Sequence, residues 1–303
     1  MKHIFIVNPA AGSGTAEKKL LPLIRSAVSR SGFEYEIHRT LNKQETCDYV
    51  RQKASEGSPV RFYACGGDGT LNDVLCGMIG CANAQLAVIP CGSGNDFAKN
   101  FSDRKALWDL DAQMQGTPQP CDVIRYEGGY SLNMLNIGVD CDVAYRQTQI
   151  KNSVLGGPLS YVAAAVQVLS KSNTYRMRYR ADGIEKEEEL MLCAIANGCF
   201  CGGGFKSAPK ASVKDGMMDI CIVRPVKGAT LLKLLLKYHQ GTHLQAKEAE
   251  GIVEYLQCRT FSLQPVSPVN VSVDGEVLAF SGSSFELLPG AVRIVVPKGA
   301  QLL

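Results

Sequence analysis

The stretch Val60-Arg61-Phe62-Tyr63-Ala64-Cys65-Gly66-Gly67-Asp68-Gly69-Thr70 decides the fold. Residues 60–65 form a short apolar run that predicts a buried strand, and residues 71–79 continue as a predicted helix. Glycines between a strand and a helix let backbone N–H groups approach an anion closely, and the helix dipole favours negative charge there. The stretch therefore predicts a strand–loop–helix unit that can bind phosphate.

Two similar units flank this stretch. Residues 4–7 predict a strand that leads into the turn Asn8-Pro9-Ala10-Ala11-Gly12-Ser13-Gly14 and then into a helix over residues 16–31. Residues 85–89 predict another strand, which enters Gly92-Ser93-Gly94-Asn95-Asp96 and a helix beginning near Phe97. With a strand over residues 34–38 and a helix over residues 46–55, the pattern predicts an α/β N-terminal domain whose parallel sheet is covered by helices.

The character of the sequence changes near Pro120, where short strand-like segments replace the alternation of strands and helices. Strands are predicted over residues 175–179, 190–196, 218–223 and 259–263, which indicates a mostly antiparallel second domain. Helices are predicted over residues 159–170 and 229–239. We interpret the acidic run 185–189 as a solvated turn.

Composition restricts the classes of function. A chain of 303 residues favours two domains, at roughly 100 to 200 residues each. The formal net charge of +3 is too small for a typical nucleic-acid-binding protein, so no nucleic-acid partner is expected. The chain opens on Met1-Lys2-His3 and a short apolar run rather than a signal peptide, and no stretch approaches the about 18 consecutive apolar residues of a membrane span. Because its 12 cysteines then indicate a reducing compartment, we expect a cytoplasmic protein.

The glycine-rich loops match neither of the common nucleotide-binding fingerprints. No G-x-x-x-x-G-K-[ST] is present, and Gly12-x-Gly14 lacks the third glycine of G-x-G-x-x-G. A single glycine turn is a weak indication of a site, since it is commonly only a tight turn. Three such loops on one edge of a sheet are a much stronger indication of phosphate binding.

The joint occurrence of three motifs resembles the bacterial diacylglycerol kinase family, which is grouped with sphingosine kinase-like lipid kinases. The motifs are Asn8-Pro9 with Gly12 to Gly14, then Gly66-Gly67-Asp68-Gly69-Thr70, then Gly92-Ser93-Gly94-Asn95-Asp96-Phe97-Ala98. The resemblance covers essentially the whole chain. It implies a phosphofructokinase-like nucleotide-binding domain over residues 1–125, completed by about residues 290–303, and a β-sandwich lipid-substrate domain over residues 126–289.

The resemblance also implies a set of residues that bind ATP. They follow the first four predicted strands: Asn8, Pro9, Ala10, Ala11, Gly12, Thr40, Gly66, Gly67, Asp68, Gly69, Thr70, Ser93 and Asp96. Asp68 and Asp96 are the acidic members of two loops and are expected to hold Mg2+, because this ion prefers oxygen ligands. Either aspartate taken alone would be interpreted as a turn former or a helix cap.

A catalytic base is implied by the segment Asp274-Gly275-Glu276. By resemblance, Asp274 and Glu276 are both candidates to take the proton of a lipid hydroxyl, and they join Asp68 as expected catalytic residues. The same segment is a hairpin signal, because Asp-Gly lies between two strand-like runs. The two interpretations are compatible, since the tip of a hairpin can carry a carboxylate.

A second, structural Mg2+ position is implied at Ser212, Asp215 and Met217, where backbone carbonyls would flank one carboxylate. Only Asp215 offers a charged ligand there. Because Asp215-Gly216 is also an ordinary turn, the side chains alone do not distinguish a metal site from a turn.

The predicted helix over residues 229–239 offers a surface for a membrane. It carries five leucines with Lys233 and Lys237, and Lys227 precedes it. Such a helix can lie on an anionic bilayer by its apolar and basic surfaces. The alternative is a helix that packs into the second domain, which is the more common role of leucine-rich helices.

Together, the motifs and their resemblance predict an ATP- and Mg2+-dependent lipid kinase, with diacylglycerol as the leading substrate and phosphatidic acid as the product. It would contact the inner face of the membrane transiently. The alternatives are a kinase of a sphingoid base, phosphatidylglycerol or a monoacylglycerol; an NAD kinase, which shares Gly-Gly-Asp-Gly-Thr; and an inactive nucleotide-binding regulator. A homodimer is compatible with the sequence, which defines no interface.

Overall fold

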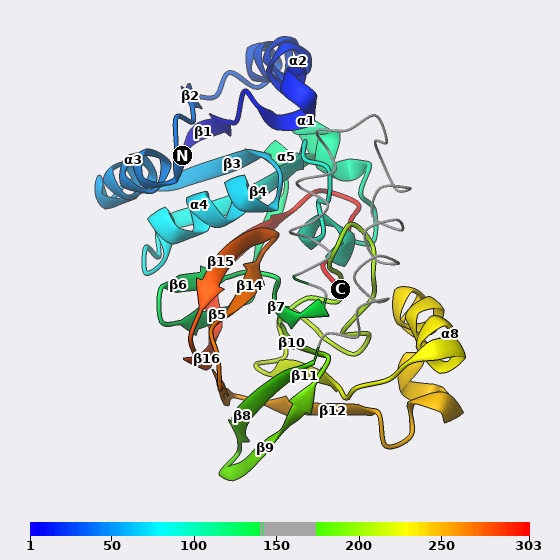
Figure 1. Cartoon of the computed structure of the whole chain (residues 1–303). Helices are drawn as coiled ribbons and strands as arrows, with labels where there is room; N and C mark the ends of the chain where they lie inside the picture. Colours follow the sequence, from blue (N-terminus) through cyan, green and yellow to red (C-terminus); the bar gives the residue numbers. More distant parts are fainter. Residues whose placement is uncertain (140, 142–173) are drawn as a thin grey trace. The chain divides into compact units, whose positions relative to one another are not determined.

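The computed structural model describes residues 1–139, 141 and 174–303 (Figure 1). The helix predicted over residues 159–170 lies outside the described residues. The chain divides into two compact units. The first unit comprises Met1–Val123, Val213–Gly216 and Leu288–Leu303, and the second comprises Ile124–Ser212 and Met217–Leu287.

A parallel sheet forms the centre of the first unit. Its strands are β1 (Lys2–Val7), β2 (Tyr35–Arg39), β3 (Val60–Gly66), β4 (Ala84–Pro90) and the last part of β16 (Ser283–Val296), in the order β2-β1-β3-β4-β16. All neighbouring pairs in this order are parallel. Val7 pairs with Cys65, and Gly66 pairs with Pro90, so the loops after β1, β3 and β4 begin side by side.

Helices cover both faces of this sheet. α2 (Ala16–Ser31) and α5 (Leu110–Met114) pack on one face, and α3 (Lys43–Ser55) and α4 (Asp68–Met78) lie on the other (Figure 1). α3 begins after Asn42, whose side chain accepts a hydrogen bond from the Glu45 amide at 3.0 Å. The predicted α/β domain is therefore confirmed.

Alternating side chains of the central strands build the core beneath α2. The rings of Phe5 and Tyr63 stack with their centroids 4.3 Å apart, and both pack in one cluster with Leu20 and Ile24. All four side chains are fully buried. Burial of one such side chain contributes about 1.5–3 kcal/mol, so this core gives the glycine-rich loops a rigid support.

The helix predicted to begin near Phe97 does begin there, and it is short. η1 (Phe97–Asn100) is a 3-10 helix of 4 residues, and α1 (Ala11–Gly14) and η2 (Ala106–Trp108) are similarly short. The Asn100 side chain donates to the Phe97 carbonyl at 3.1 Å, and Phe101 is extended and forms a β-bridge with Leu302. This pairing with a residue far along the chain ends the helix, and local periodicity could not indicate it.

Two antiparallel sheets form the second unit. One contains β8 (Tyr175–Ala181), β9 (Ile184–Leu190), β13 (Thr260–Pro265), the first part of β16, the end of β5 (Thr117–Tyr126) and β6 (Gly129–Ser131). The other has the order β12-β11-β10-β7-β14-β15, with bounds β7 (Met134–Gly138), β10 (Leu192–Ala196), β11 (Met218–Val223), β12 (Val253–Cys258), β14 (Val269–Val273) and β15 (Glu276–Phe280). Buried side chains of both sheets, among them Phe261, Phe285, Ile137 and Ile220, form one cluster. The predicted sandwich is confirmed.

The interpretation of residues 185–189 as a turn is wrong, because these residues belong to β9. The turn lies earlier, at Asp182 and Gly183, which have φ values of 47° and 87°. Across the strand pair, Glu187 accepts hydrogen bonds from Arg176 and Arg178, each at 2.8 Å. These cross-strand ion pairs stabilise an acidic strand whose glutamate side chains would otherwise repel one another.

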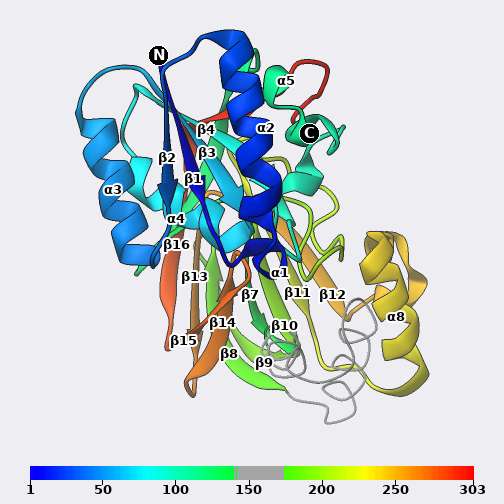
Figure 2. The ribbon, with the colours of Figure 1, turned by 90° about the horizontal axis from the view of Figure 1, so that it is seen from above.

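α8 (Gly228–Gln240) confirms the helix predicted over residues 229–239, and η3 (His243–Gln245) and η4 (Lys247–Ala249) follow it. In both views α8 lies beside β12 (Figure 1, Figure 2). It ends at Gly241, whose φ of 75° is the left-handed conformation typical of a helix C-cap. Among the residues that the structure describes, no helix is long and apolar enough to span a membrane.

Candidate active site

The three glycine-rich loops lie together at the carboxyl edge of the parallel sheet. Loop 1 (residues 8–14) follows β1, loop 2 (residues 66–70) joins β3 to α4, and loop 3 (residues 91–96) follows β4. The Cys91 amide donates to the Gly66 carbonyl at 2.7 Å, and Asn8 Nδ2 donates to Thr70 Oγ1 at 3.0 Å. In open α/β folds, the carboxyl edge of the sheet is where ligands bind.

Glycines make this convergence sterically possible. A Cβ atom on Gly92 would lie 2.5 Å from the Cα atom of Gly67, and a Cβ atom on Gly66 would lie 2.3 Å from Thr70 Oγ1. The backbones of loops 2 and 3 therefore touch with no side chain between them. Such bare backbone is what a phosphate-binding loop requires.

Loop 1 contains three successive residues in the left-handed backbone conformation. Gly12, Ser13 and Gly14 have φ values of 59°, 56° and 78°. Because Ser13 is not a glycine, its conformation is strained and must be held by its surroundings. Asn8 Oδ1 accepts a hydrogen bond from the Ala10 amide at 2.9 Å, which fixes the start of the turn. A turn of this kind can form an anion-binding concavity.

The two acidic residues of loops 2 and 3 face a common region. Asp68 Oδ2 accepts from the Asp96 amide at 3.0 Å, and Asp68 Oδ1 accepts from the Phe97 amide at 3.1 Å. The Asp96 carboxylate pairs with Lys99 Nζ at 2.5 Å. A Cβ atom on Gly94 would lie 3.3 Å from Asp68 Oδ2 and 3.5 Å from Asp96 Oδ2, so both carboxylates border the space at Gly94.

This pair of carboxylates fits a magnesium ion that arrives with a nucleotide. Mg2+ usually binds through one or two carboxylates together with phosphate oxygens and water, rather than in a cage built by the protein alone. The described residues contain no group of three or more His, Cys, Asp or Glu side chains able to hold a metal by themselves. Asp68 and Asp96 are the residues whose carboxylates would hold such an ion.

The other predicted nucleotide residues border the same edge. Thr40 follows β2, and its amide donates to the Val7 carbonyl at 3.0 Å, which brings it beside the start of loop 1. Pro9 and Ser93 are exposed on loops 1 and 3, and Gly69 is half-buried in loop 2.

A basic depression of about 340 Å³ adjoins loop 3 and was not predicted. Its lining includes Gly94, Lys99, Arg104, Lys105 and Trp108. The only signal for it in the sequence is the group of basic residues between positions 99 and 105. Positive charge beside a loop that approaches phosphate favours an anionic ligand.

One cysteine precedes loop 2 and another is the first residue of loop 3. Cys65 and Cys91 are buried. Burial raises the pKa of the Cys91 thiol to about 12 and also raises the pKa of Cys65. Because the thiolate is the reactive form, burial makes both thiols poor nucleophiles.

In the second unit, Asp274 and Glu276 have different surroundings. Asp274 and Gly275 have φ values of 46° and 91°, which confirms the predicted hairpin turn between β14 and β15. The Asp274 carboxylate is 6% exposed and accepts four hydrogen bonds, from the Ser131 hydroxyl at 2.8 Å and from the amides of Leu132, Asn133 and Met134 at 2.9, 3.0 and 3.0 Å. Glu276 is half-buried at the first position of β15. Asp274 therefore holds the turn before β7.

The predicted second metal position lies where the chain passes between the units. Asp215 lies in Val213–Gly216 of the first unit, whereas Ser212 and Met217 are counted with the second. Asp122, which was not predicted, anchors this turn: its carboxylate accepts from the amides of Gly216 and Gly290, each at 2.7 Å. These partners lie 94 and 168 residues away along the chain, so no local pattern could reveal them.

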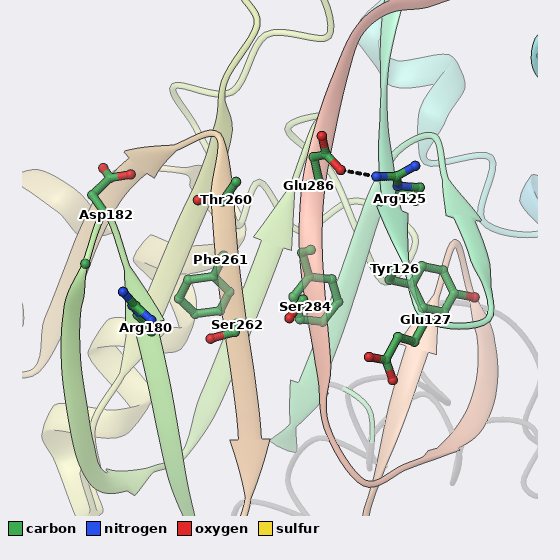
Figure 3. Close-up of a pocket in the computed structure, with 12 residues that line it drawn as sticks. Arg125, Tyr126, Glu127, Arg180, Asp182, Thr260, Phe261, Ser262, Ser284 and Glu286 are labelled. Atoms are coloured by element: carbon green, nitrogen blue, oxygen red, sulfur yellow. Dashed lines mark hydrogen bonds and ion pairs between the residues drawn. The ribbon is translucent and has the colours of Figure 1, made fainter.

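A groove of about 540 Å³ lies within the second unit and contains none of the predicted site residues. Figure 3 shows Arg125 and Glu286 pointing toward each other at its edge, where they form an ion pair. Arg180 and Asp182 of the β8–β9 hairpin lie on its other side, and Thr260, Ser262 and Ser284 lie between (Figure 3). These mixed charges and hydroxyls are typical of a solvated sheet face.

Comparison with known proteins gives matches over nearly the whole chain. The family model described as the diacylglycerol kinase catalytic domain matches residues 2–126, and the one described as the YegS C-terminal NAD kinase beta sandwich-like domain matches residues 133–296. A protein of Alcanivorax borkumensis named probable lipid kinase YegS-like is 26% identical over 285 residues, which cover 92% of this chain and 94% of that protein.

Two Bacillus proteins extend the comparison. The Bacillus subtilis protein named diacylglycerol kinase is 25% identical over 300 residues, covering 97% of this chain and 95% of that protein. A crystal structure described as a diacylglycerol kinase of Bacillus anthracis matches 100% of this chain and 98% of its own, with a TM-score of 0.71 at 22% identity. The structural match shows that the two chains share a fold.

Proposed function

Because the chain belongs to the family of diacylglycerol kinases and YegS-like lipid kinases, we propose that it uses ATP and Mg2+ to phosphorylate the hydroxyl of a membrane lipid. Diacylglycerol is the substrate that we propose, and phosphatidic acid is the product. The observation that carries the proposal is the convergence of three glycine-rich loops at one sheet edge, with the Asp68 and Asp96 carboxylates bordering the same space at Gly94.

Phosphate binding is the task that we assign to the first unit. The bare backbone at Gly67 and Gly92 and the left-handed turn of loop 1 suit the three phosphates of ATP. Phosphoryl transfer requires little covalent chemistry from a protein, so positioning and charge stabilisation account for most of the catalysis. A bound Mg2+ would neutralise negative charge on the phosphates, and Asp68 and Asp96 are the residues that would hold it.

Proton removal is the task that we assign to Glu276. In the reaction, the lipid hydroxyl oxygen forms a bond to the γ-phosphorus, the bond between that phosphorus and the oxygen of ADP breaks, and the hydroxyl proton passes to the carboxylate. The four hydrogen bonds that Asp274 accepts support this choice, because they commit its carboxylate to the turn over residues 131–134. A base needs lone pairs that are directed at its substrate.

The decisive experiment presents purified protein with ATP, Mg2+ and separate lipids in mixed micelles, and identifies phosphorylated products by mass. The panel contains diacylglycerol, a monoacylglycerol, a sphingoid base and phosphatidylglycerol, with NAD as a soluble acceptor. We expect phosphatidic acid from diacylglycerol, at a rate at least about tenfold above every other acceptor. Faster turnover of another lipid or of NAD would replace the substrate that we propose, and the absence of ATP consumption with all acceptors would contradict kinase activity.

We also propose that the protein works in the cytoplasm and meets its substrate at the inner face of the membrane. The 12 cysteines are all free thiols, which is typical of proteins in a reducing compartment. Fractionation of cells with an antibody against the chain tests this location. Recovery in a secreted or periplasmic fraction would contradict it.

A further inference from the structure

Helix α8 carries apolar side chains on the side that faces away from its own unit. Leu232 and Leu236, one turn apart, are 60% and 61% exposed. On the opposite side of the helix, Leu234 and Tyr238 are buried. A surface helix normally has one apolar stripe, which faces the core, and a polar opposite face. The second apolar stripe of α8 is therefore not explained by the packing of α8 on the second unit.

The buried side fixes the helix firmly in place. Leu234 packs in a cluster with Met191, Val226 and Ala249. The ring of Tyr238 lies 4.8 Å from that of His243, measured between centroids. Because these contacts anchor α8, its outer leucines stay on the surface without any need for the helix to unfold.

The lysines of α8 and of the residue before it give the helix itself charges of one sign. Between Lys227 and Gln240 the chain contains three lysines and no aspartate or glutamate. Lys237 pairs with Glu248 at 2.8 Å, and this carboxylate also interacts electrostatically with Lys233, whereas the side chains of Lys227 and Lys233 are exposed. A surface that combines exposed leucines with lysines is complementary to a bilayer with anionic headgroups.

We propose that α8 docks the protein on the surface of an anionic bilayer, with Leu232 and Leu236 entering the boundary between headgroups and acyl chains and with Lys227 and Lys233 contacting anionic headgroups. The inference rests on the proposed function, because a kinase whose substrate is a membrane lipid must meet that lipid at the bilayer. An interfacial helix enters the bilayer by about 5–10 Å, which is within reach of two leucine side chains.

The size of the stripe argues against a second copy of the chain as its occupant. α8 has 13 residues, which makes it about 20 Å long. Two leucines on such a helix supply far less than the about 800 Å² that each partner buries in a stable protein interface. A bilayer needs no such matched surface, because every leucine that enters it adds to binding independently.

The test measures sedimentation with vesicles of equimolar phosphatidylcholine and phosphatidylglycerol. We expect Leu232→Glu with Leu236→Glu to weaken binding at least about tenfold, because two apolar anchors are lost and two like charges are introduced. Lys227→Gln with Lys233→Gln should weaken binding about tenfold on these vesicles and should have little effect on pure phosphatidylcholine.

The matched control is Ile184→Glu, which makes the same kind of change at a side chain that is 66% exposed in the same unit but lies outside α8. Equal binding by all variants overturns the proposal.

Insertion is tested separately with Leu236→Trp. The natural chain has one tryptophan, Trp108, so the change in fluorescence relative to the parent protein reports the new side chain. We expect brominated phospholipids in the same vesicles to quench this additional signal. No quenching, or a change of oligomeric state in the leucine variants with unaltered vesicle binding, overturns bilayer docking.

Activity measurements separate this proposal from the proposed function. Diacylglycerol in vesicles and a short-chain diacylglycerol dissolved as monomers are compared as substrates. We expect the double leucine variant to lose at least about tenfold with vesicles and to keep the parental rate with monomers, since α8 carries none of the proposed site residues. If the parent protein phosphorylates neither substrate, the proposed function fails, while sedimentation still decides whether α8 docks.

Discussion

The Asp68 carboxylate accepts a hydrogen bond from the Asp96 backbone amide at 3.0 Å. The side chain of one expected metal ligand therefore binds the main chain of the other. Asp68 is also the first residue of α4, where its negative charge interacts favourably with the helix dipole. A carboxylate has about four lone-pair sites, so Asp68 can accept these backbone hydrogen bonds and still ligate a cation. Its structural and metal-binding roles must therefore be separated by experiment.

Asp68→Asn and Asp68→Ala separate these roles. The asparagine retains one acceptor oxygen for loop 3 but loses the charge, whereas the alanine leaves the amides of Asp96 and Phe97 without this partner. We expect both variants to lose at least about a hundredfold in kinase activity, since both remove a charged magnesium ligand. The alanine, which removes both acceptor oxygens, should lower the free energy of unfolding by about 1–3 kcal/mol, and the asparagine, which removes one, should lower it by less. Urea unfolding and a coupled ATP assay measure the two effects, and equal unfolding midpoints in both variants would contradict the structural role.

Gly92→Ala tests the close approach of loops 2 and 3. The new Cβ atom would lie 2.5 Å from Gly67 Cα, and because this neighbour is backbone, the loops must separate. We expect nucleotide binding, measured by calorimetry with a non-hydrolysable ATP analogue, to weaken at least about tenfold, because the aligned amides are displaced.

Gly80→Ala is the matched control for Gly92→Ala. Gly80 has a φ of 82° but no atom within 4 Å of its added Cβ. We expect this variant to lose about 1 kcal/mol of stability through backbone strain and to bind the nucleotide normally. Normal binding by Gly92→Ala would show that loops 2 and 3 do not jointly form the phosphate site.

Local signals explain which features could be predicted from the sequence. The strands and loops of the first unit were predicted because apolar runs, glycines and helical spacing are properties of neighbouring residues. The strand over Glu187 was missed because its stability depends on Arg176 and Arg178 of the partner strand. Long-range partners also decide the role of Asp274, whose donor at Ser131 lies 143 residues earlier in the chain. Sequence motifs placed this aspartate beside Glu276 as an equal candidate, and they could not indicate the four hydrogen bonds that the Asp274 carboxylate accepts.

Asp274→Ala and Glu276→Gln test this distinction. Loss of the Asp274 carboxylate leaves a buried hydroxyl and three amides without their acceptor, so we expect a decrease in unfolding free energy of about 2–4 kcal/mol. Glu276→Gln should cost less stability than Asp274→Ala and should lower the phosphorylation rate about a hundredfold or more.

Thermal unfolding and steady-state kinetics on the same preparations give both quantities. Ser131→Ala is the control for the Asp274 network, because it removes one donor and should cost only about 1 kcal/mol. A Glu276→Gln enzyme with normal turnover would reject this residue as the base.

Because two histidines are buried, we expect the free energy of unfolding to decrease in mild acid. Burial lowers the pKa of His3, helped by the positive charge of Arg61, and burial lowers the pKa of His243; both fall to about 4 from an ordinary value of 6.5. Below pH 6.5 the unfolded chain binds protons that the folded chain does not bind until about pH 4, so acid favours unfolding across this window.

Each histidine should cost about 2 kcal/mol of stability between pH 7 and pH 5. Urea unfolding across this range measures the loss, which His3→Gln should reduce by about half. A His3→Gln protein with the parental pH dependence would show that His3 already carries its proton in the folded state.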